Sequence, residues 1–215
     1  MNVLISGTTS GIGKACAEKF LAMGHRVFGV DIAEASIEHP AYAHYVCDIC
    51  SAELPQIDDV EILVNNAGTL EDAQSIAVNL EGTIAFTERY VTSPVLRSVV
   101  FIASASARTG SEFPRYVASK AGIVGYMKNL ALALAPRGVT VNSVSPGGVI
   151  TPANQHILES DELYAAVLAE SLLGKWAEPE EIADLTYFMA VTNRSITGED
   201  ILIDNGEMLK SNFIW

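Results

Sequence analysis

Basic residues are scarce in this sequence. Thirteen Lys and Arg stand against 26 Asp and Glu, which leaves a formal net charge of -13 over 215 residues. A field of that sign repels polyphosphate and anionic lipid over most of the surface, so it argues against a nucleic-acid or membrane-surface role. The hydrophobic fraction of 49% argues equally against a disordered chain.

Cysteine is also rare, and long apolar runs are missing. Three cysteines, an odd number, do not fit a disulfide framework. Cys47 and Cys50 have the spacing of a redox or half-zinc motif, but there is no second pair and the four histidines are scattered, so we predict neither use. The longest uncharged stretches, such as residues 98–107, are too short to span a membrane. Since no signal peptide is recognisable either, we expect a cytoplasmic protein.

Seven short β-rich runs recur along the chain, and helical or small-residue segments separate them. The runs lie at residues 3–5, 27–30, 45–46, 62–64, 99–102, 139–141 and 201–203. They are apolar on both faces, which is typical of strands covered on both sides. This alternation predicts an α/β fold with a parallel, doubly wound sheet and right-handed crossovers. A chain of this length can bury one sizeable core but hardly two, so we expect one domain over residues 1–215.

Three of the intervening segments carry clear helix signals. Apolar residues keep helical spacing from Ile12 to Met23, and Gly24 then ends the pattern. A stretch rich in Ala, Leu, Met and Lys covers residues 116–135 and ends at a proline. Pro179, followed by two glutamates, is typical of the first turn of another helix.

A glycine-rich turn joins the first strand to the first helix. It reads Ser6-Gly7-Thr8-Thr9-Ser10-Gly11-Ile12-Gly13. Small residues let the backbone approach a pyrophosphate at the N-terminus of a helix, although a tight turn without a ligand also uses glycine. Asp31 ends the second strand, where a carboxylate accepts both ribose hydroxyls of an adenosine and repels a 2′-phosphate. The turn therefore indicates a dinucleotide site that prefers NAD(H) to NADP(H).

Several motifs in one order resemble the classical short-chain dehydrogenase/reductase family, over nearly the whole chain. The family motif TGxxxGxG is matched from Ser6 to Gly13 with Ser in place of Thr, and residues 65–68 are similar to its NNAG. Residues 116–120 are similar to YxxxK, residues 146–151 to PGxxxT, and residues 179–183 also fit. The resemblance implies a Rossmann-type seven-stranded sheet of order 3-2-1-4-5-6-7. It also implies an oxidoreductase that uses NAD(H) to interconvert a secondary alcohol and a ketone.

Four residues form the expected catalytic set. Tyr116 and Lys120 stand four apart, so they share one helix face, although the spacing alone is also typical of an incidental pair. The resemblance implies that Tyr116 donates or accepts the proton and that Lys120 holds the nicotinamide ribose and lowers the tyrosine pKa. It implies a substrate-binding serine after the fifth strand, for which Ser104 is expected and Ser106 competes because the interval to the tyrosine is one residue short. Asn79 is implied to support a water and the lysine in a proton relay.

The resemblance also implies a cofactor site built from the turns after the strands. The expected contacts are Gly7, Ser10, Gly11, Ile12, Gly13, Asp31, Ile32, Asp48, Ile49, Asn66, Ala67, Gly68, Tyr116, Lys120, Pro146, Gly147, Val149 and Thr151. Asp48 is the expected adenine-binding acid. Cys47 and Cys50 flank this turn and are expected to be small, semi-buried residues.

Two departures from the family concern shape. The chain is shorter than most classical members between Asp31 and Asn65 and between Gly68 and Asn79, so trimmed crossover helices or loops are expected there. The segment 151–174 occupies the position of the family's variable substrate lid. Its apolar residues include Ile157, Leu158, Leu163, Tyr164, Val167, Leu168 and Leu172. A helix packed in the core would show the same pattern, so both interpretations remain open.

The C-terminal end is unusually apolar. Met208-Leu209 is followed by Phe213-Ile214-Trp215 at the end of the sequence. Such side chains seldom stay exposed on a soluble monomer. With the resemblance, this end predicts a homo-oligomer, a tetramer or a dimer, in which Phe213 and Trp215 contact a neighbouring subunit. The alternative function is a catalytically silent, dinucleotide-binding regulatory or scaffold protein.

Overall fold

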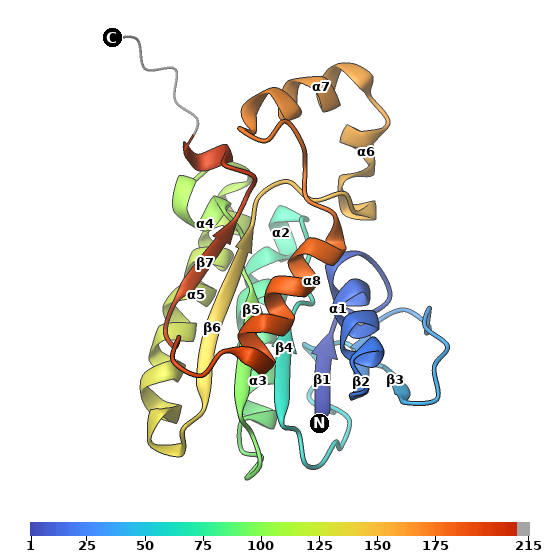
Figure 1. Ribbon diagram of the computed structural model, residues 1–215, viewed down its shortest axis with the longest axis vertical. Helices are drawn as coiled ribbons and strands as arrows, with labels where there is room; N and C mark the ends of the chain where they lie inside the picture. The colour runs from blue at the N-terminus through green and yellow to red at the C-terminus, as the bar shows by residue number, and fades with distance from the viewer. Residues whose placement is uncertain (210–215) are drawn as a thin grey trace.

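The strands form one parallel sheet in the order β3-β2-β1-β4-β5-β6-β7 (Figure 1). The computed structural model describes residues 1–209. Its strands are β1 (Asn2–Ser6), β2 (Arg26–Asp31), β3 (Tyr42–Val46), β4 (Ile62–Asn65), β5 (Ser98–Ile102), β6 (Thr140–Pro146) and β7 (Asp200–Ile203). The fold class and the strand order expected from the sequence are confirmed.

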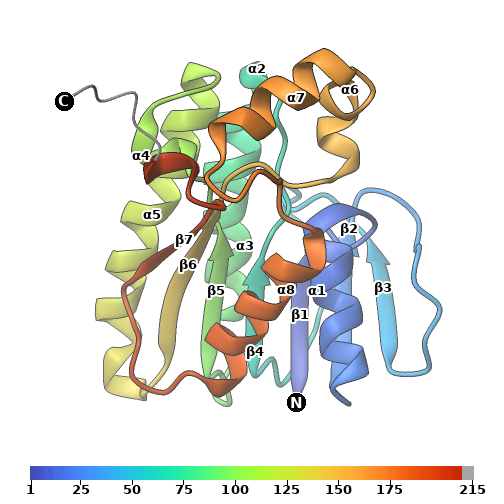
Figure 2. The same cartoon turned by 45° about the horizontal axis from the view of Figure 1, so that its top comes forward.

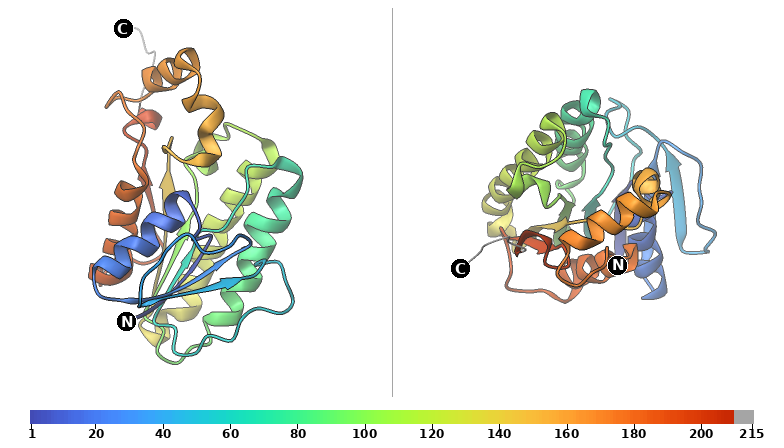
Figure 3. Two further views of the ribbon diagram at one scale, coloured as in Figure 1. Left: turned by 90° about the vertical axis from the view of Figure 1, so that its right-hand side faces the viewer. Right: turned by 90° about the horizontal axis from the view of Figure 1, so that it is seen from above.

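Helices cover both faces of the sheet. α1 (Gly11–Ala22) and α8 (Pro179–Tyr187) pack together on one face, and α3 (Thr83–Tyr90) and α5 (Pro114–Leu134) lie on the other (Figure 3). The remaining helical segments are α2 (Asp72–Ser75), α4 (Ser106–Thr109), α6 (Gln155–Leu158), α7 (Asp161–Glu170), two π-helical segments η1 (Ile76–Gly82) and η4 (Phe188–Thr192), and the 3₁₀ segments η2 (Ala135–Arg137), η3 (Pro152–Asn154) and η5 (Glu207–Leu209). Within residues 1–209, no helix combines the length and apolarity needed to cross a membrane.

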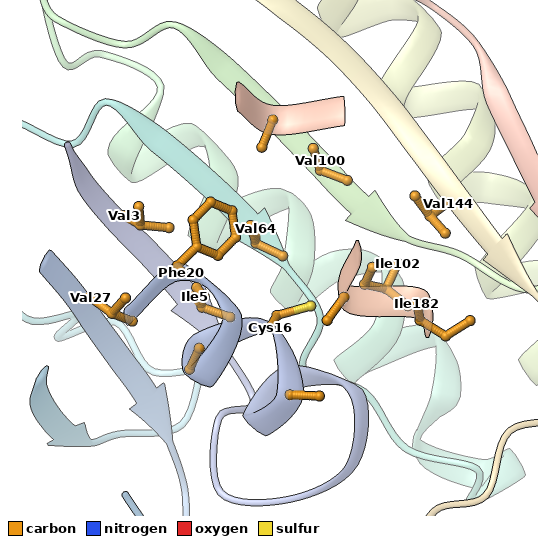
Figure 4. Close-up of a cluster of buried hydrophobic side chains, with 14 of the residues drawn as sticks. Val3, Ile5, Cys16, Phe20, Val27, Val64, Val100, Ile102, Val144 and Ile182 are labelled. Atoms are coloured by element: carbon orange, nitrogen blue, oxygen red, sulfur yellow. The ribbon is translucent and has the colours of Figure 1, made fainter. Parts of the chain in front are cut away.

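Alternation along each central strand creates two cores. Val3 and Ile5 face α1 and α8, whereas Leu4 between them faces α3 and α5. Successive side chains of a strand point to opposite faces, so a strand that is apolar at every position can bury both. Figure 4 shows the first core, where Phe20 and Cys16 of α1 contact the sheet. Packing on both faces of the sheet fixes the positions of the strand ends, and residues at the carboxyl ends of the strands form the candidate site described below.

The connections on one side of the sheet are short, as the sequence predicts. Residues 32–41 and 47–61 contain no helix, and α2 has a single turn of four residues. β3 therefore lacks a helical cover, and its five residues are half-buried or exposed rather than covered on both faces. The expected apolar contacts of Phe213 and Trp215 lie outside the described residues.

Several element boundaries differ from the sequence expectation. The largest differences among the strands are at β3, which begins at Tyr42 rather than Tyr45, and at β6, which ends at Pro146 rather than Val141. α5 begins at Pro114 rather than Tyr116, because proline is favoured in the first turn of a helix, where its missing N–H costs nothing. Met23 lies just past the end of α1 with 51% of its surface exposed, so it does not extend the apolar face of that helix. β6 begins at Thr140, although Val139 itself is buried.

Candidate active site

A cleft of about 1060 Å³ opens at the carboxyl ends of the strands. The strand order reverses between β1 and β4, and open α/β sheets bind their ligands outside such a reversal. The cleft is lined by every residue of the expected cofactor set except Gly13, and by Ser104 of the catalytic set. Asn79 and Gly13 lie behind residues that line the cleft. The structure thus brings together nearly all of the residues that the sequence analysis singled out.

The glycine turn after β1 is packed tightly against α1 and the turn after β4. Gly7 has a φ of 76°, which favours glycine, and a Cβ at Gly13 would lie 1.9 Å from the Gly7 carbonyl oxygen. The Asn66 side-chain amide donates to the carbonyls of Ser6 and Gly7 at 3.1 and 3.0 Å. The N–H groups of the first turn of α1, beside this bend, have no partner within the helix. This donor set fits a pyrophosphate.

The end of the cleft beside β2 and β3 is acidic. One oxygen of Asp31 accepts from the backbone and hydroxyl of Thr9 at 3.0 and 2.9 Å, and the other accepts from Ala33 N at 3.0 Å. Asp48 accepts from Cys50 N at 2.8 Å. Both carboxylates retain lone pairs for further donors. Among residues 1–209, the one basic side chain that lines the cleft is Lys120, at the other end.

Tyr116, Lys120 and Ser104 meet at the opposite end, beyond β5. Their exposed fractions are 9%, 7% and 8%, so each side chain is largely withdrawn from water. Tyr116 and Lys120 lie one helical turn apart on α5, and the Lys120 ammonium is 5.7 Å from the centre of the tyrosine ring. The Lys120 Nζ also donates to the Ile102 carbonyl at the end of β5, at 3.0 Å. The helix and the strand thereby hold the two titratable groups in one place.

Burial controls the ionisation of this pair. Burial raises the pKa of Tyr116 to about 12, with a smaller lowering by a hydrogen bond from Ser104 and a further rise from Glu112. Burial also lowers the pKa of Lys120 to about 8, and Glu112 acts in the opposite direction. Loss of hydration dominates the pKa of Tyr116 in this geometry, and the expected lowering of that pKa by Lys120 stays a prediction. At neutral pH the lysine is mainly charged and the phenol is protonated.

Ser104 and Ser106 form a hydrogen-bonded pair with different roles. The Ser106 hydroxyl and backbone N–H both donate to the Ser104 Oγ, at 2.9 and 3.2 Å. Because Ser104 accepts these bonds, its own proton remains available as a donor, to the Tyr116 oxygen or to an oxygen atom of a ligand in the cleft. Ser104 is also the serine that acts on the pKa of Tyr116. The geometry favours Ser104 as the group that faces the substrate and Ser106 as its support.

Asn79 lies in the π-helical segment η1 rather than in a regular α-helix. Its Oδ1 accepts from Thr69 N at 2.7 Å, and its Nδ2 donates to the Thr69 carbonyl at 2.9 Å and to Ser119 Oγ at 3.3 Å. The side chain thus ties the loop after β4 to α5, the helix that carries Tyr116. The side-chain amide is therefore engaged with protein atoms, and its expected support of a water and of Lys120 stays a prediction.

The segment 151–174 forms an overhang above the cleft, which Figure 2 shows as α6 and α7. None of the seven apolar residues named in the sequence analysis is buried, and Ile157 and Val167 line the cleft. This excludes the core-helix interpretation and supports the lid interpretation. Trp176, which follows the segment, is 7% exposed and also lines the cleft.

The sequence analysis missed four acidic residues that line the cleft, Glu71, Glu112, Glu170 and Glu207. Nothing in their spacing connects them, since they come from four separate segments. The cysteine expectation can also be compared with the structure. Cys47 and Cys50 are both free thiols, and Cys47 is half-buried as expected, whereas Cys50 is exposed, so the expectation of a semi-buried residue is wrong for Cys50. Residues 1–209 contain no cluster of three metal-ligating side chains.

Comparison with known proteins identifies the family to which this chain belongs. The family described as Enoyl-(Acyl carrier protein) reductase matches residues 7–207. The 3-oxoacyl-[acyl-carrier-protein] reductase FabG of Aquifex aeolicus is 31% identical, over 94% of this chain and 95% of that protein.

Solved structures show the same architecture. A 4-hydroxyisoleucine dehydrogenase complexed with NADH has a TM-score of 0.85 and 26% identity, over 98% of this chain and 99% of that one. A protein from Agrobacterium tumefaciens with bound NADP has a TM-score of 0.88 at 24% identity, over 97% of this chain and 96% of that one, and supports the fold alone. The chain therefore belongs to the short-chain dehydrogenase/reductase family of oxidoreductases.

Proposed function

We propose that this protein is an NAD(H)-dependent oxidoreductase that interconverts a secondary alcohol and a ketone, with residues 1–215 as one catalytic domain. The observation that carries the proposal is the convergence of Ser104, Tyr116 and Lys120 at one end of a cleft whose other end holds Asp31. The separation of a proton-transfer group from an adenosine-binding carboxylate along one cleft suits a dinucleotide that extends between them.

Each residue has a role that its contacts support. When bound, the nicotinamide supplies or accepts the hydride. Ser104 donates a hydrogen bond to the substrate oxygen, using the proton that the contacts from Ser106 leave free. In reduction the Tyr116 phenol gives its proton to that oxygen, and in oxidation the phenolate takes it.

Lys120 and Asn79 hold this arrangement. The Lys120 ammonium has two N–H donors beyond its bond to Ile102, and these suit the ribose hydroxyls of the cofactor. Its charge opposes the loss of hydration that raises the Tyr116 pKa. Asn79 acts through Thr69 and Ser119 and keeps α5 in register with the loop after β4.

The preference for NAD(H) rests on electrostatics at the adenosine end. Asp31 occupies the end of β2, and neither Ser10 nor Ile32 supplies a basic group there. A 2′-phosphate would meet the Asp31 carboxylate without a counter-ion among the described residues that line the cleft. The related structures hold either NADH or NADP, so this choice depends on the residues of each chain.

A screen of secondary alcohols with NAD⁺ and NADP⁺ tests the proposal through the appearance of reduced-nicotinamide absorbance. We expect turnover of a subset of alcohols with a higher kcat/KM for NAD⁺. Equal or better efficiency with NADP⁺ would contradict the cofactor assignment. Tight NADH binding without turnover of any alcohol or ketone would favour the silent dinucleotide-binding alternative.

We also propose that the protein is a homo-oligomer, a dimer or a tetramer, in the cytoplasm. The apolar C-terminal sequence supports this, as do Leu132 on α5 and Leu209, each with 78% of its surface exposed. Light scattering at micromolar concentration tests the assembly, and a monomer would contradict it.

A further inference from the structure

A chain of hydrogen bonds links the glycine turn to β3 beneath the adenosine end of the cleft. Thr8 is fully buried, and its Oγ1 lies 2.8 Å from the Tyr42 hydroxyl. That hydroxyl is 2.8 Å from His44 Nδ1, and His44 Nε2 is 2.9 Å from the Ala33 carbonyl oxygen. Tyr42 and His44 stand two residues apart on β3, so they share one face of the strand. The chain therefore ends in the loop that directly follows Asp31.

The chemistry of these groups sets the direction of each bond. A carbonyl oxygen can only accept, so His44 Nε2 donates to Ala33. The neutral imidazole then accepts at Nδ1 from the Tyr42 hydroxyl, whose oxygen in turn accepts from Thr8. Burial raises the pKa of Tyr42, a hydrogen bond with Thr8 lowers it, and the charge of Asp31 raises it again. The net rise keeps the proton that Tyr42 gives to His44.

The two ends of this chain hold Asp31 from opposite sides. Thr9, the neighbour of Thr8 in the turn, donates its N–H and its hydroxyl to one oxygen of Asp31. The N–H of Ala33 donates to the other oxygen, and the carbonyl of the same residue is the atom that His44 holds. These contacts form a closed cycle around the carboxylate. We name it the Asp31 network, and its members are Thr8, Thr9, Asp31, Ala33, Tyr42 and His44.

A glycine inside β2 leaves room for this network. Gly29 pairs with His44 across the sheet. A Cβ on Gly29 would lie 2.1 Å from the Tyr42 hydroxyl and 2.4 Å from Thr8 Oγ1. Glycine weakens the interior of a strand and often marks a close approach of other atoms. Here the hydrogen bond between Tyr42 and Thr8 passes over the position that a larger side chain would fill.

The loop after Asp31 has no helix to hold it, since residues 32–41 contain none. A carboxylate at the end of a strand can turn between rotamers, and one that turns away opposes a 2′-phosphate less. Thr8, Tyr42 and His44 lie behind the residues that line the cleft. They can therefore act on a cofactor only through Asp31 and its neighbours.

We propose that Tyr42 and His44 are positioning residues that set the cofactor preference of this protein. Through the Asp31 network they hold the carboxylate where it accepts the ribose hydroxyls and faces a 2′-phosphate. Discrimination then depends on the network as well as on Asp31 itself, because a fixed charge rejects the wrong ligand more strongly than one that can move away. This inference rests on the proposed function and adds the residues that control its selectivity.

Removal of single hydroxyl groups tests the inference. Tyr42→Phe keeps the aromatic ring and should lower the ratio of NAD⁺ to NADP⁺ kcat/KM at least about threefold, through the KM for NAD⁺ rather than kcat. Thr8→Val removes the same bond from its other side and should lower the ratio by a smaller factor. Because one preparation serves for both cofactors, an unfolded fraction cancels in the ratio.

Tyr45→Phe is the matched control. Tyr45 lies on the other face of β3, packs against the other core and is outside the Asp31 network. The control should keep the ratio of the unmodified protein. An unchanged ratio in Tyr42→Phe, or an equal fall in Tyr45→Phe, would overturn the inference.

A double variant distinguishes positioning from a general structural effect. In the Asp31→Ala background the network has lost the group that it holds, so Tyr42→Phe should change the ratio less than about 1.5-fold. A further fall as large as that in the unmodified background would show that Tyr42 acts by a route other than Asp31, which contradicts the proposed role.

Calorimetric titration with NADH and with NADPH, without any alcohol, separates this inference from the proposed function. The unmodified protein should bind NADH more tightly than NADPH, and Tyr42→Phe should narrow the difference. If this is found but no alcohol or ketone is turned over, the oxidoreductase proposal fails and the role of Tyr42 stands. If alcohols are oxidised and Tyr42→Phe keeps the full preference for NADH, the inference fails alone. An unmodified protein that binds both cofactors equally contradicts the cofactor assignment and this inference together.

Discussion

Gly13→Ala should damage both the fold and the cofactor cradle. The added Cβ would lie 1.9 Å from the Gly7 carbonyl oxygen and 2.3 Å from the Asn66 Nδ2. Both neighbours are fixed, since that amide donates to the carbonyls of Ser6 and Gly7. Overpacking of this kind costs about 1–3 kcal/mol, and loss of the amide hydrogen bonds adds about 1 kcal/mol. We therefore expect the free energy of unfolding to fall by about 3 kcal/mol.

The measurement combines denaturant unfolding with NADH titration, and Gly125→Ala is the matched control. Gly125 lies in α5 with nothing within 4 Å of its added Cβ, so the same change should stabilise the protein by about 1 kcal/mol through helix propensity. NADH affinity should fall at least about tenfold in the Gly13 variant and stay unchanged in the control. A Gly13→Ala protein with normal stability and NADH affinity would refute the packing argument.

Three further predictions follow from the charges at the two ends of the cleft. Asp31→Ala should lower the ratio of NAD⁺ to NADP⁺ efficiency at least about tenfold, because it removes the charge that opposes the 2′-phosphate; an unchanged ratio would contradict this. Alcohol oxidation should accelerate from about pH 6 to about pH 8, because it needs the phenolate form of Tyr116. Burial raises the pKa of Tyr116 to about 12, so the fraction of phenolate increases with pH over this whole range. Reduction uses the protonated phenol and should not accelerate over that range, and an oxidation rate independent of pH would count against Tyr116 as the base. Lys120→Ala should weaken both NADH binding and turnover, which steady-state kinetics and NADH titration measure together; loss of turnover alone would argue against its role toward the ribose.

Much of the site could be read from the sequence because its signals are local. The glycine turn, Asp31 at the end of a strand and the four-residue spacing of Tyr116 and Lys120 each depend on one element and its neighbour. The order of the strands and the role of Ser104 came from the family resemblance, and the sheet confirms the former. The structure adds the bonds from Ser106 that separate the two serines.

Other features depend on tertiary packing and carry no such local signal. The pKa of Tyr116 is set by burial, so the expected effect of Lys120 could not be judged from spacing. Glu112 has a φ of 84°, a left-handed conformation that is unusual outside glycine, and no motif marks it. Its approach to Glu207 joins residues far apart in the chain. The exposure of β3 follows from the trimmed connections between Asp31 and Asn65, which the length of the chain indicates and local hydrophobicity does not.

The most direct test of the account compares the unmodified protein with Tyr116→Phe, using one alcohol found in the substrate screen. Because only the phenolic oxygen is removed and the pyrophosphate cradle is remote, NADH affinity should stay within about threefold, while kcat falls by at least about 100-fold. A variant that binds NADH normally and loses turnover supports Tyr116 as the proton-transfer group. A variant that keeps more than about a tenth of the rate would contradict the central claim that this cleft carries out hydride transfer coupled to that phenol.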